Sequence, residues 1–397
     1  MKDHNRILKS VGAVCLAVVL GCGTGYADAI SASGSPRVYE TDIPQAHTDE
    51  EWSRLRDNTL EWDELEELVH QYNPTICQLW KTFRNEQREG KYSVSFTDAY
   101  AEAEENYSNM ITDNNSDIME AVAGLSLASS RATVDNAVVT GDFKLASLSI
   151  ERTEKEMVET VRGYLINIYR TALAEQLAEL TAAYDETLLA LEQRKMAAGT
   201  STAMDVLTKE KSVKDARVLA TDNAAARIKA KQTVLVNLGW PYNAEPAITA
   251  IPMPTDEDIL GRNPDQDARG ALKNSYAKQY YDRALTLMEG ETTSAAYRVK
   301  AENMEQTVYS EMNTKYNALQ QALNERDQAD LKAKNLTEQK NQAERQYGVG
   351  AISQRELEAA VYNAQSADIS AAIKAYDLAE KYYAYIAAVK GLCGTIS

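Results

Sequence analysis

Proline placement is the feature of this sequence that most restricts its fold. The eight prolines lie at positions 36, 44, 74, 241, 246, 252, 254 and 264, so residues 75–240 and 265–397 contain none. A proline inside a helix removes a backbone hydrogen bond and costs about 3 kcal/mol, so long helices can form only in such proline-free stretches. The cluster "WPYNAEPAITAIPMPTDED" at 240–258 then predicts a linker between two helical halves.

Apolar residues inside these stretches recur at helical spacing. One series steps by three and four: Tyr309, Met312, Tyr316, Leu319 and Leu323. A longer heptad series contains one polar member, Asp368: Leu357, Val361, Ala364, Asp368, Ala371, Ala375, Leu378, Tyr382, Tyr385 and Val389. The first half has a similar series: Leu173, Leu177, Leu180, Tyr184 and Leu191. Sustained heptads rich in alanine are typical of closely packed helices, so the sequence predicts an all-α fold of long antiparallel coiled-coil hairpins.

Two motifs with the same spacing of arginine, glycine and acid mark an internal duplication. "RKMAAGTSTAMDVL" begins at Arg194 and "RQYGVGAISQREL" at Arg345, and their arginine, glycine and acid are each offset by 151 positions. An Asn-Pro pair opens each half, and a glycine closes it: Asn73-Pro74 with Gly239, and Asn263-Pro264 with Gly391. Landmarks that recur in the same order indicate one αα-hairpin unit used twice.

The motif residues are candidates for a functional tip. They are Arg194, Gly199, Asp205, Arg345, Gly350 and Glu356. Glycine tolerates the left-handed conformation that ends a helix, and an acid in the first turn of the next helix favours its start. Thr200, Ser201, Thr202 and Ser353 are the candidate N-caps. Capping and partner docking are compatible roles for Asp205 and Glu356, and the sequence leaves both open.

The domain prediction follows from these landmarks. It comprises a signal peptide at 1–29, an extended leader at 30–58, a first helical repeat at 59–240, a Pro-rich linker at 241–263 and a second helical repeat at 264–397. Basic residues before "VGAVCLAVVLGCG" and small residues at Ala27 and Ala29 predict export with cleavage after Ala29. Lipidation of Cys22 after "VLGC" is the alternative. After cleavage Cys77 and Cys393 remain, either bridged or free.

Composition argues against several classes of function. With 42 Lys+Arg against 59 Asp+Glu, the formal charge of −17 excludes a nucleic-acid binder. Beyond His4 in the signal, only His47 and His70 are present. The sequence has no zinc-binding His or Cys motif, no phosphate-binding glycine loop and no nucleophile elbow. We therefore expect no enzyme activity, no cofactor and no metal.

The two motifs resemble the repeated motif of TolC-type outer-membrane efflux proteins. The resemblance covers residues 59–240 and 264–392 and includes the Asn-Pro and Leu-Gly landmarks. It implies a homotrimer whose helices form a hollow cylinder, with the glycine turns at a tip that docks a periplasmic adaptor (membrane fusion) protein and an inner-membrane transporter. It also implies that Asp205 and Glu356 line or latch the entrance.

The sequence departs from that family where membrane strands are expected. Short alternating segments occur at "KYSVSFT" (91–97), "GLSLASS" (124–130) and "AAYRVKA" (295–301), and the first half holds 39 extra residues, which we place within 90–140. Such segments are too few and unequal for a closed barrel, so little or no β-barrel is predicted. The function predicted is an envelope conduit for efflux, located in the outer membrane or otherwise membrane- or wall-associated. The alternative is an exported coiled-coil structural or adaptor protein without a pore.

Overall fold

The computed structural model describes residues 47–93, 95–112 and 117–396. The chain divides into a unit Met1–Gly34 and a unit Ser35–Ser397, and the description below concerns the second. The predicted signal peptide, with its alternatives at Cys22 and Ala29, lies outside the described residues, as does the leader up to residue 46.

The described chain is almost entirely helical. The first half contains α2 (Asp49–Leu55), β1 (Thr59–Leu60), α3 (Leu65–Tyr72), α4 (Pro74–Arg88), the 3-10 helix η1 (Lys91–Ser93), α5 (Phe96–Thr112), α6 (Asp117–Gly141), α7 (Phe143–Ala197) and α8 (Ala203–Asn237). The second half contains β2 (Ala247–Ile248), α9 (Asp256–Leu260), α10 (Pro264–Asn274), α11 (Tyr276–Leu285), α12 (Glu291–Gly348) and α13 (Gln354–Val389). Among the described residues, no helix is both long enough and apolar enough to cross a bilayer.

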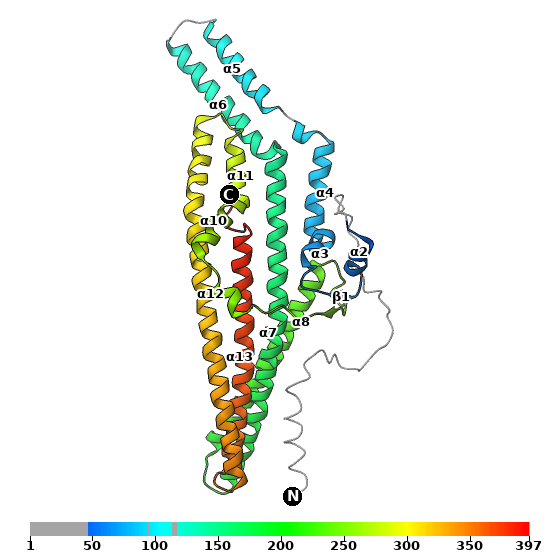
Figure 1. Cartoon of the computed structure of the whole chain (residues 1–397), viewed down its shortest axis with the longest axis vertical. Coiled ribbons are helices and arrows are strands. Elements are labelled where there is room, and N and C mark those ends of the chain that lie inside the picture. The colour runs from blue at the N-terminus through cyan, green and yellow to red at the C-terminus, as the bar shows by residue number, and fades with distance from the viewer. Residues whose placement is uncertain (1–46, 94, 113–116, 397) are drawn as a thin grey trace. The chain divides into compact units, whose positions relative to one another are not determined.

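Two long antiparallel hairpins, α7–α8 and α12–α13, dominate this unit (Figure 1). α7 has 55 residues and α12 has 58, which correspond to about 80–90 Å at the usual helical rise. The hairpins meet along α7 and α13, so the four helices form a ribbon in the order α8, α7, α13, α12. The prediction of an all-α fold of long, duplicated helical hairpins is confirmed.

The duplication is visible in matched local geometry. Asn73 and Asn263 both cap a helix that starts with proline, each side chain accepting two backbone N–H bonds. Gly239 and Gly391 both adopt positive φ, at 79° and 109°, just after the descending helix. The same short sequence signals therefore begin and end the helices of both halves.

The heptad series in α13 consists of two lines of residues, each spaced by seven, and only one line is buried. Residues spaced by seven form the buried line: Leu357, Ala364, Ala371, Leu378 and Tyr385. Asp368 belongs to the alternate line and is exposed, at the edge of a groove between α12 and α13. The polar member of the series therefore lies at the rim of the seam rather than inside it.

A two-stranded parallel sheet ties the linker to the start of the first half. Thr59 pairs with Ala247 and Leu60 with Ile248. The hydroxyl of Tyr169 on α7 donates to the carbonyl of Thr249 at 2.9 Å, which anchors the same segment. In the described part of the leader, α2 is helical.

The three segments with strand-like alternation are not strands. Residues 91–97 contain η1 and the start of α5, residues 124–130 lie in α6, and residues 295–301 lie in α12. Their alternation does not produce strands, because short alternating runs also occur within helices, whose flanking sequence decides the structure. The extra residues of the first half include the helical hairpin α5–α6.

The hairpin α5–α6 is fastened to the rest of the chain by Asp135. This carboxylate on α6 is fully buried, and its Oδ1 accepts from the Tyr100 hydroxyl on α5. The same oxygen accepts from the backbone N–H groups of Glu289 and Gly290, at 3.1 and 3.2 Å, directly before α12. Asp135 therefore supplies an N-terminal contact to α12 that its own capping residue, Gly290, cannot supply.

Candidate functional site: the two helical turns

The turn between α7 and α8 ends one helix and starts the next within six residues. Gly199 has a φ of 76°, and its N–H donates to the carbonyl of Met196 at 2.9 Å. The next N–H, of Thr200, reaches back to the carbonyl of Lys195, also at 2.9 Å. This pair of bonds is a Schellman-type C-cap, which requires a residue that accepts positive φ at its centre.

The turn between α12 and α13 repeats this geometry. Gly350 has a φ of 73°, and its N–H donates to the carbonyl of Tyr347 at 2.9 Å. The N–H of Ala351 donates to the carbonyl of Gln346 at 2.8 Å. A Cβ added to either glycine would meet nothing within 4 Å, so glycine is required here by the backbone conformation rather than by crowding.

Asp205 and Glu356 each close a capping box. Thr202 and Ser353 are the N-caps, and each donates its hydroxyl and its backbone N–H to the acid three residues later. The hydroxyl bond from Thr202 lowers the pKa of Asp205 most, and the backbone bond from Ser353 lowers that of Glu356 most. The predicted capping role of both acids is thus present in the structure. Of the three candidate N-caps between α7 and α8, Thr202 is the one that caps α8.

Arg194 and Arg345 lie in the last turn of the helix before each glycine, and both are exposed. Neither forms an ion pair within the described part of the chain. Their positive charge near a helix C-terminus interacts favourably with the helix dipole. Their side chains are therefore available to a partner, but the geometry assigns them no bond.

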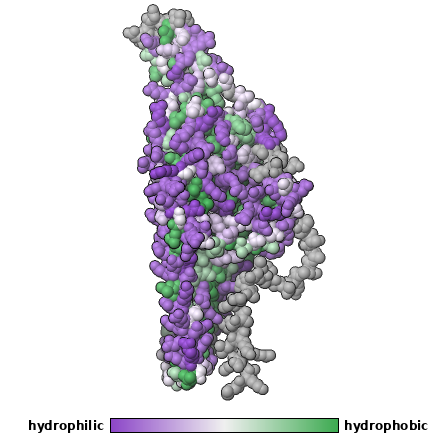
Figure 2. Space-filling view, in the orientation of Figure 1, coloured by the Kyte–Doolittle hydropathy of each residue, from purple (hydrophilic) through white to green (hydrophobic). Residues whose placement is uncertain are grey.

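The turns also expose large apolar side chains that sequence reasoning missed. Around the first turn these are Met196, Met204 and Leu207, and around the second they are Tyr347 and Val349, which is 81% exposed. Figure 2 shows hydrophobic surface at this end within a mostly hydrophilic face. The sequence did contain a signal for these residues. They are apolar side chains close to a turn glycine, a place where exposure to solvent is expected.

The two hairpins are joined by aromatic stacking near the turns. Tyr184 on α7 stacks on Tyr362 on α13 with ring centroids 4.2 Å apart and planes at 7°. Farther from the turns, Tyr169 stacks on Tyr376 at 5.6 Å. The two stacks hold α7 against α13, so both turns lie at the same end of the ribbon (Figure 1).

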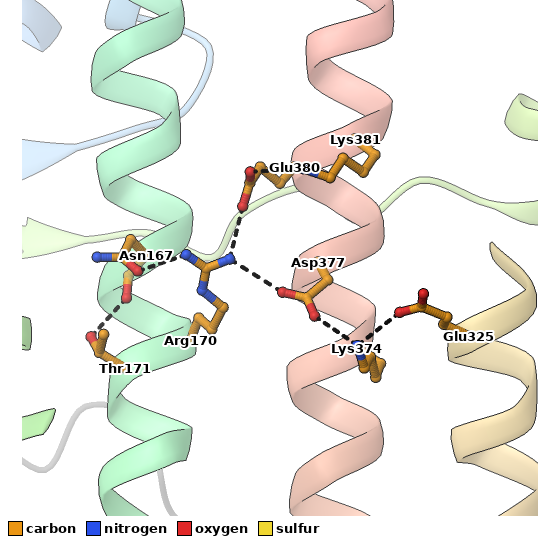
Figure 3. Close-up of polar contacts among 8 residues, drawn as sticks. All are labelled: Asn167, Arg170, Thr171, Glu325, Lys374, Asp377, Glu380 and Lys381. Atoms are coloured by element: carbon orange, nitrogen blue, oxygen red, sulfur yellow. Dashed lines mark hydrogen bonds and ion pairs between the residues drawn. The ribbon is translucent and has the colours of Figure 1, made fainter. Parts of the chain in front are cut away.

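A charged network crosses three helices beside the second stack (Figure 3). Arg170 on α7 contacts Asp377 and Glu380 on α13, at 3.2 and 2.8 Å. Lys374 bridges Asp377 to Glu325 on α12, at 3.4 and 2.8 Å. These residues are partly exposed, so the network contributes alignment of the helices more than stability. Sequence reasoning did not find this network.

The described residues include two buried cysteines and no metal-ligating cluster. Within residues 47–93, 95–112 and 117–396, no group of three or more His, Cys, Asp or Glu is placed to hold a metal. Cys77 and Cys393 are both buried and form no disulfide, and burial raises their pKa values to about 11 and about 12. Such thiols are unreactive.

Comparison with known proteins finds similarity only among solved structures. No family model and no curated protein sequence matches the chain. The CmeC outer membrane channel of Campylobacter jejuni aligns at 11% identity and a TM-score of 0.49, over 89% of this chain and 90% of the channel. The MtrE outer membrane channel of Neisseria gonorrhoeae aligns at 12% identity and a TM-score of 0.44, over 83% and 89%. A membrane protein of Pseudomonas aeruginosa aligns at 12% identity and a TM-score of 0.45, over 93% and 99%. Outer-membrane channels are thus among the structures to which this chain is similar, and the similarity concerns fold alone.

Proposed function

We propose that this protein is a TolC-like envelope component of an efflux or export system. In this proposal several copies, three by the family resemblance, close a ring of helices around a conduit. The two turns at one end dock a periplasmic adaptor or an inner-membrane transporter, through the exposed apolar side chains and through Arg194 and Arg345. The observation that carries the proposal is the four-helix ribbon, whose edge helices α8 and α12 expose apolar side chains among the described residues.

Among the described residues, the edge formed by α8 keeps an apolar face that is exposed. α8 packs along α7, and its outward side chains include several large hydrophobics: Met204, Leu207, Val218, Leu219, Ile228 and Val236. A helix with apolar residues on two faces is typical of one that packs on both sides. The other edge, α12, exposes Leu331 and carries a shallow groove beside it, of about 330 Å³.

The two edges match in height above the turns. Val218 lies 19 residues after Gly199, and Leu331 lies 19 residues before Gly350, so both are about 28 Å from the turn end. Their side chains are 51% and 60% exposed. Pairing α8 of one copy with α12 of the next would bury both, and repeating this contact generates a ring where its rotation closes.

A double cysteine variant tests the ring. Val218→Cys/Leu331→Cys, oxidised in envelope extracts, is expected to give a ladder of cross-linked species that ends at a closed trimer. Each single variant should give no such ladder, and the buried native cysteines should not react. The double variant could also give monomers alone, under conditions where both introduced cysteines react with maleimide. That result would contradict the conduit and favour the alternative of a pore-free coiled-coil rod. Docking is tested separately, by loss of adaptor co-purification in Val349→Asp without loss of the ladder.

A further inference from the structure

The exposed side of α8 carries a regular series of residues. They are spaced alternately by three and four positions, which is the spacing of a coiled-coil seam. In order from the first turn, six exposed members are Leu207, Lys211, Lys214, Val218, Thr221 and Ala225. Because α8 buries other residues, among them Val206 and Val213, within its own hairpin, this series forms a second seam on the helix.

α12 carries a matching series along its edge of the ribbon. Its exposed members, mostly amides, are Asn324, Gln328, Leu331, Asn335, Glu338 and Gln342. Counted in residues from Gly199 and from Gly350, both series stand at 8, 12, 15, 19, 22 and 26. Since both turns lie at the same end of the ribbon, each residue of one series has a counterpart at the same height on the other edge.

Both edges have shallow depressions between these residues. Each depression contains four residues of one helix at the spacing i, i+3, i+4 and i+7, which is the hole that receives a side chain of a facing helix. On α12 the depressions measure about 330 and 490 Å³, and these sets are Gln328, Leu331, Lys332 and Asn335, then Asn335, Glu338, Gln339 and Gln342. On α8 the depression measures about 410 Å³, and the set is Lys214, Arg217, Val218 and Thr221.

Pairing the two edges at equal height places side chains over these holes. Val218, 19 residues from its glycine, lies over the first α12 hole, whose members are 15 to 22 residues from Gly350. Leu331, also at 19, lies over the α8 hole, whose members are 15 to 22 residues from Gly199. Lys211, at 12, lies over the second α12 hole, whose members are 8 to 15 residues away. The contact therefore has an apolar layer and, nearer to the turns, a charged layer.

The second α12 hole is chemically suited to an ammonium group. Its carboxylate, Glu338, is level with Lys211 and forms no ion pair within the described part of the chain. The other three members of the hole are amides, whose side-chain oxygens accept hydrogen bonds. A lysine side chain entering this hole would meet one opposite charge and several acceptors.

The charges around this layer do not oppose the pairing. Arg345 also lines the depression, but it lies seven residues nearer to the turn than Glu338, about 10 Å along the helix, and is level with Met204. Lys211 contacts Asp215 on its own helix at 2.6 Å. Their side chains are 76% and 61% exposed, so this bond contributes little and can be exchanged.

We propose that Lys211 of one copy binds in the hole around Glu338 of the next copy and sets the register between the copies. This inference rests on the conduit proposed above, to which it adds the residues that decide which heights meet. A shift by one step in one direction would bring Glu338 level with Leu207. A shift in the other direction would bring Glu338 level with Lys214, but would move Val218 from Leu331 to Asn335. Equal height satisfies both layers, and polar residues in a seam fix alignment in this way.

Charge exchange tests the pair in full-length protein that carries Val218→Cys/Leu331→Cys, with the rate of cross-linking as the measurement. Glu338→Lys should lower this rate about fivefold, because two lysines then face each other. Adding Lys211→Glu should restore the rate to within about twofold of the parent. Glu344→Lys makes the same charge change at an exposed position of α12 outside the series, and it should leave the rate unchanged.

Cysteine pairs test the register directly. Lys211→Cys/Glu338→Cys should cross-link chains, whereas Lys211→Cys/Asn335→Cys and Lys211→Cys/Gln342→Cys should do so about fivefold more slowly or less. Faster cross-linking of either neighbouring pair would overturn the proposed register.

The results separate this inference from the conduit. A normal cross-linked ladder with Glu338→Lys would leave the ring standing and overturn the charged layer. Failure of Lys211→Glu to restore the rate would show that Glu338→Lys acts without Lys211, and it would also overturn the pair. No cross-linking from any cysteine pair, with all introduced cysteines reactive towards maleimide, would overturn the ring and the register together.

Discussion

A buried polar contact between His70 and Glu154 fastens the opening helices of the first half to α7. Nδ1 of His70 on α3 lies 3.1 Å from both carboxylate oxygens of Glu154 on α7. Nε1 of Trp80 on α4 donates to Glu154 Oε2 at 2.8 Å. His70 and Glu154 are only 5% and 6% exposed, so the pair is screened from solvent. We predict that its two members contribute unequally when removed singly.

The magnitude follows from what each substitution leaves behind. His70→Leu leaves a buried carboxylate without the imidazole that contacts it, and an unsatisfied buried group of this kind costs about 3 kcal/mol. Glu154→Gln removes the charge but keeps an oxygen that can accept from Trp80, so we expect a cost of about 1 kcal/mol. In His70→Leu/Glu154→Gln no unpaired charge remains, and the double variant should be more stable than His70→Leu alone.

Tryptophan fluorescence during urea unfolding measures this core selectively. The four tryptophans, at 52, 62, 80 and 240, all belong to or pack against the same hydrophobic cluster. If the unfolding free energy falls with urea concentration at the same slope in all variants, they expose the same surface area on unfolding. The reasoning fails if His70→Leu costs no more than Glu154→Gln, or if the double variant loses the sum of the two single effects.

Three further predictions concern other parts of the fold. Gly350→Ala should cost about 1 kcal/mol from its positive φ, whereas Gly391→Ala, whose Cβ would overlap the carbonyl of Asn274, should cost about 3 kcal/mol or more; comparing their unfolding midpoints checks this. Burial raises the pKa of Glu64 to about 7, so the folded state holds this proton more tightly and stability falls as pH rises from about 4.5 to 7. Glu64→Gln should flatten that fall, measured as unfolding midpoints at pH 5 and 8. Asp135→Ala should cost about 2 kcal/mol and speed amide hydrogen exchange at the start of α12 but not at the turns.

The sequence was a good guide wherever a structure depends on a few neighbouring residues. A C-cap needs one residue that accepts positive φ, and an N-cap needs one hydroxyl with an acid three residues later. Gly199, Gly350, Thr202 and Ser353 meet these needs locally, so the turns could be placed without knowledge of the fold. The absence of proline allowed the long helices for the same reason.

Contacts between distant segments could not be predicted in this way. Arg170 and Asp377 are 207 positions apart, and their contact depends on α7 and α13 being neighbours. A signal existed, because they lie 29 and 27 residues from their turn glycines and therefore at similar heights. Asp135 gave no local signal, since it caps a helix more than 150 positions away. The alternating runs at 91–97 and 124–130 gave no usable signal, because a short run does not reveal which partner will bury it.

Helix direction limits how the ribbon edges can pair. Neighbours within the chain alternate, since α8 leads away from the turns, α7 leads towards them, α13 leads away and α12 leads towards them. If all turns are to stay at one end, pairing α8 with another α8 would place parallel helices together and break this alternation. Pairing α8 with α12 of the next copy preserves it and uses both exposed edges. Such a contact joins two different surfaces, so it closes a ring or grows without limit, and it does not produce a simple two-fold dimer. A ladder from Val218→Cys/Leu331→Cys that stopped at two chains would therefore contradict the ring even though the chains associate.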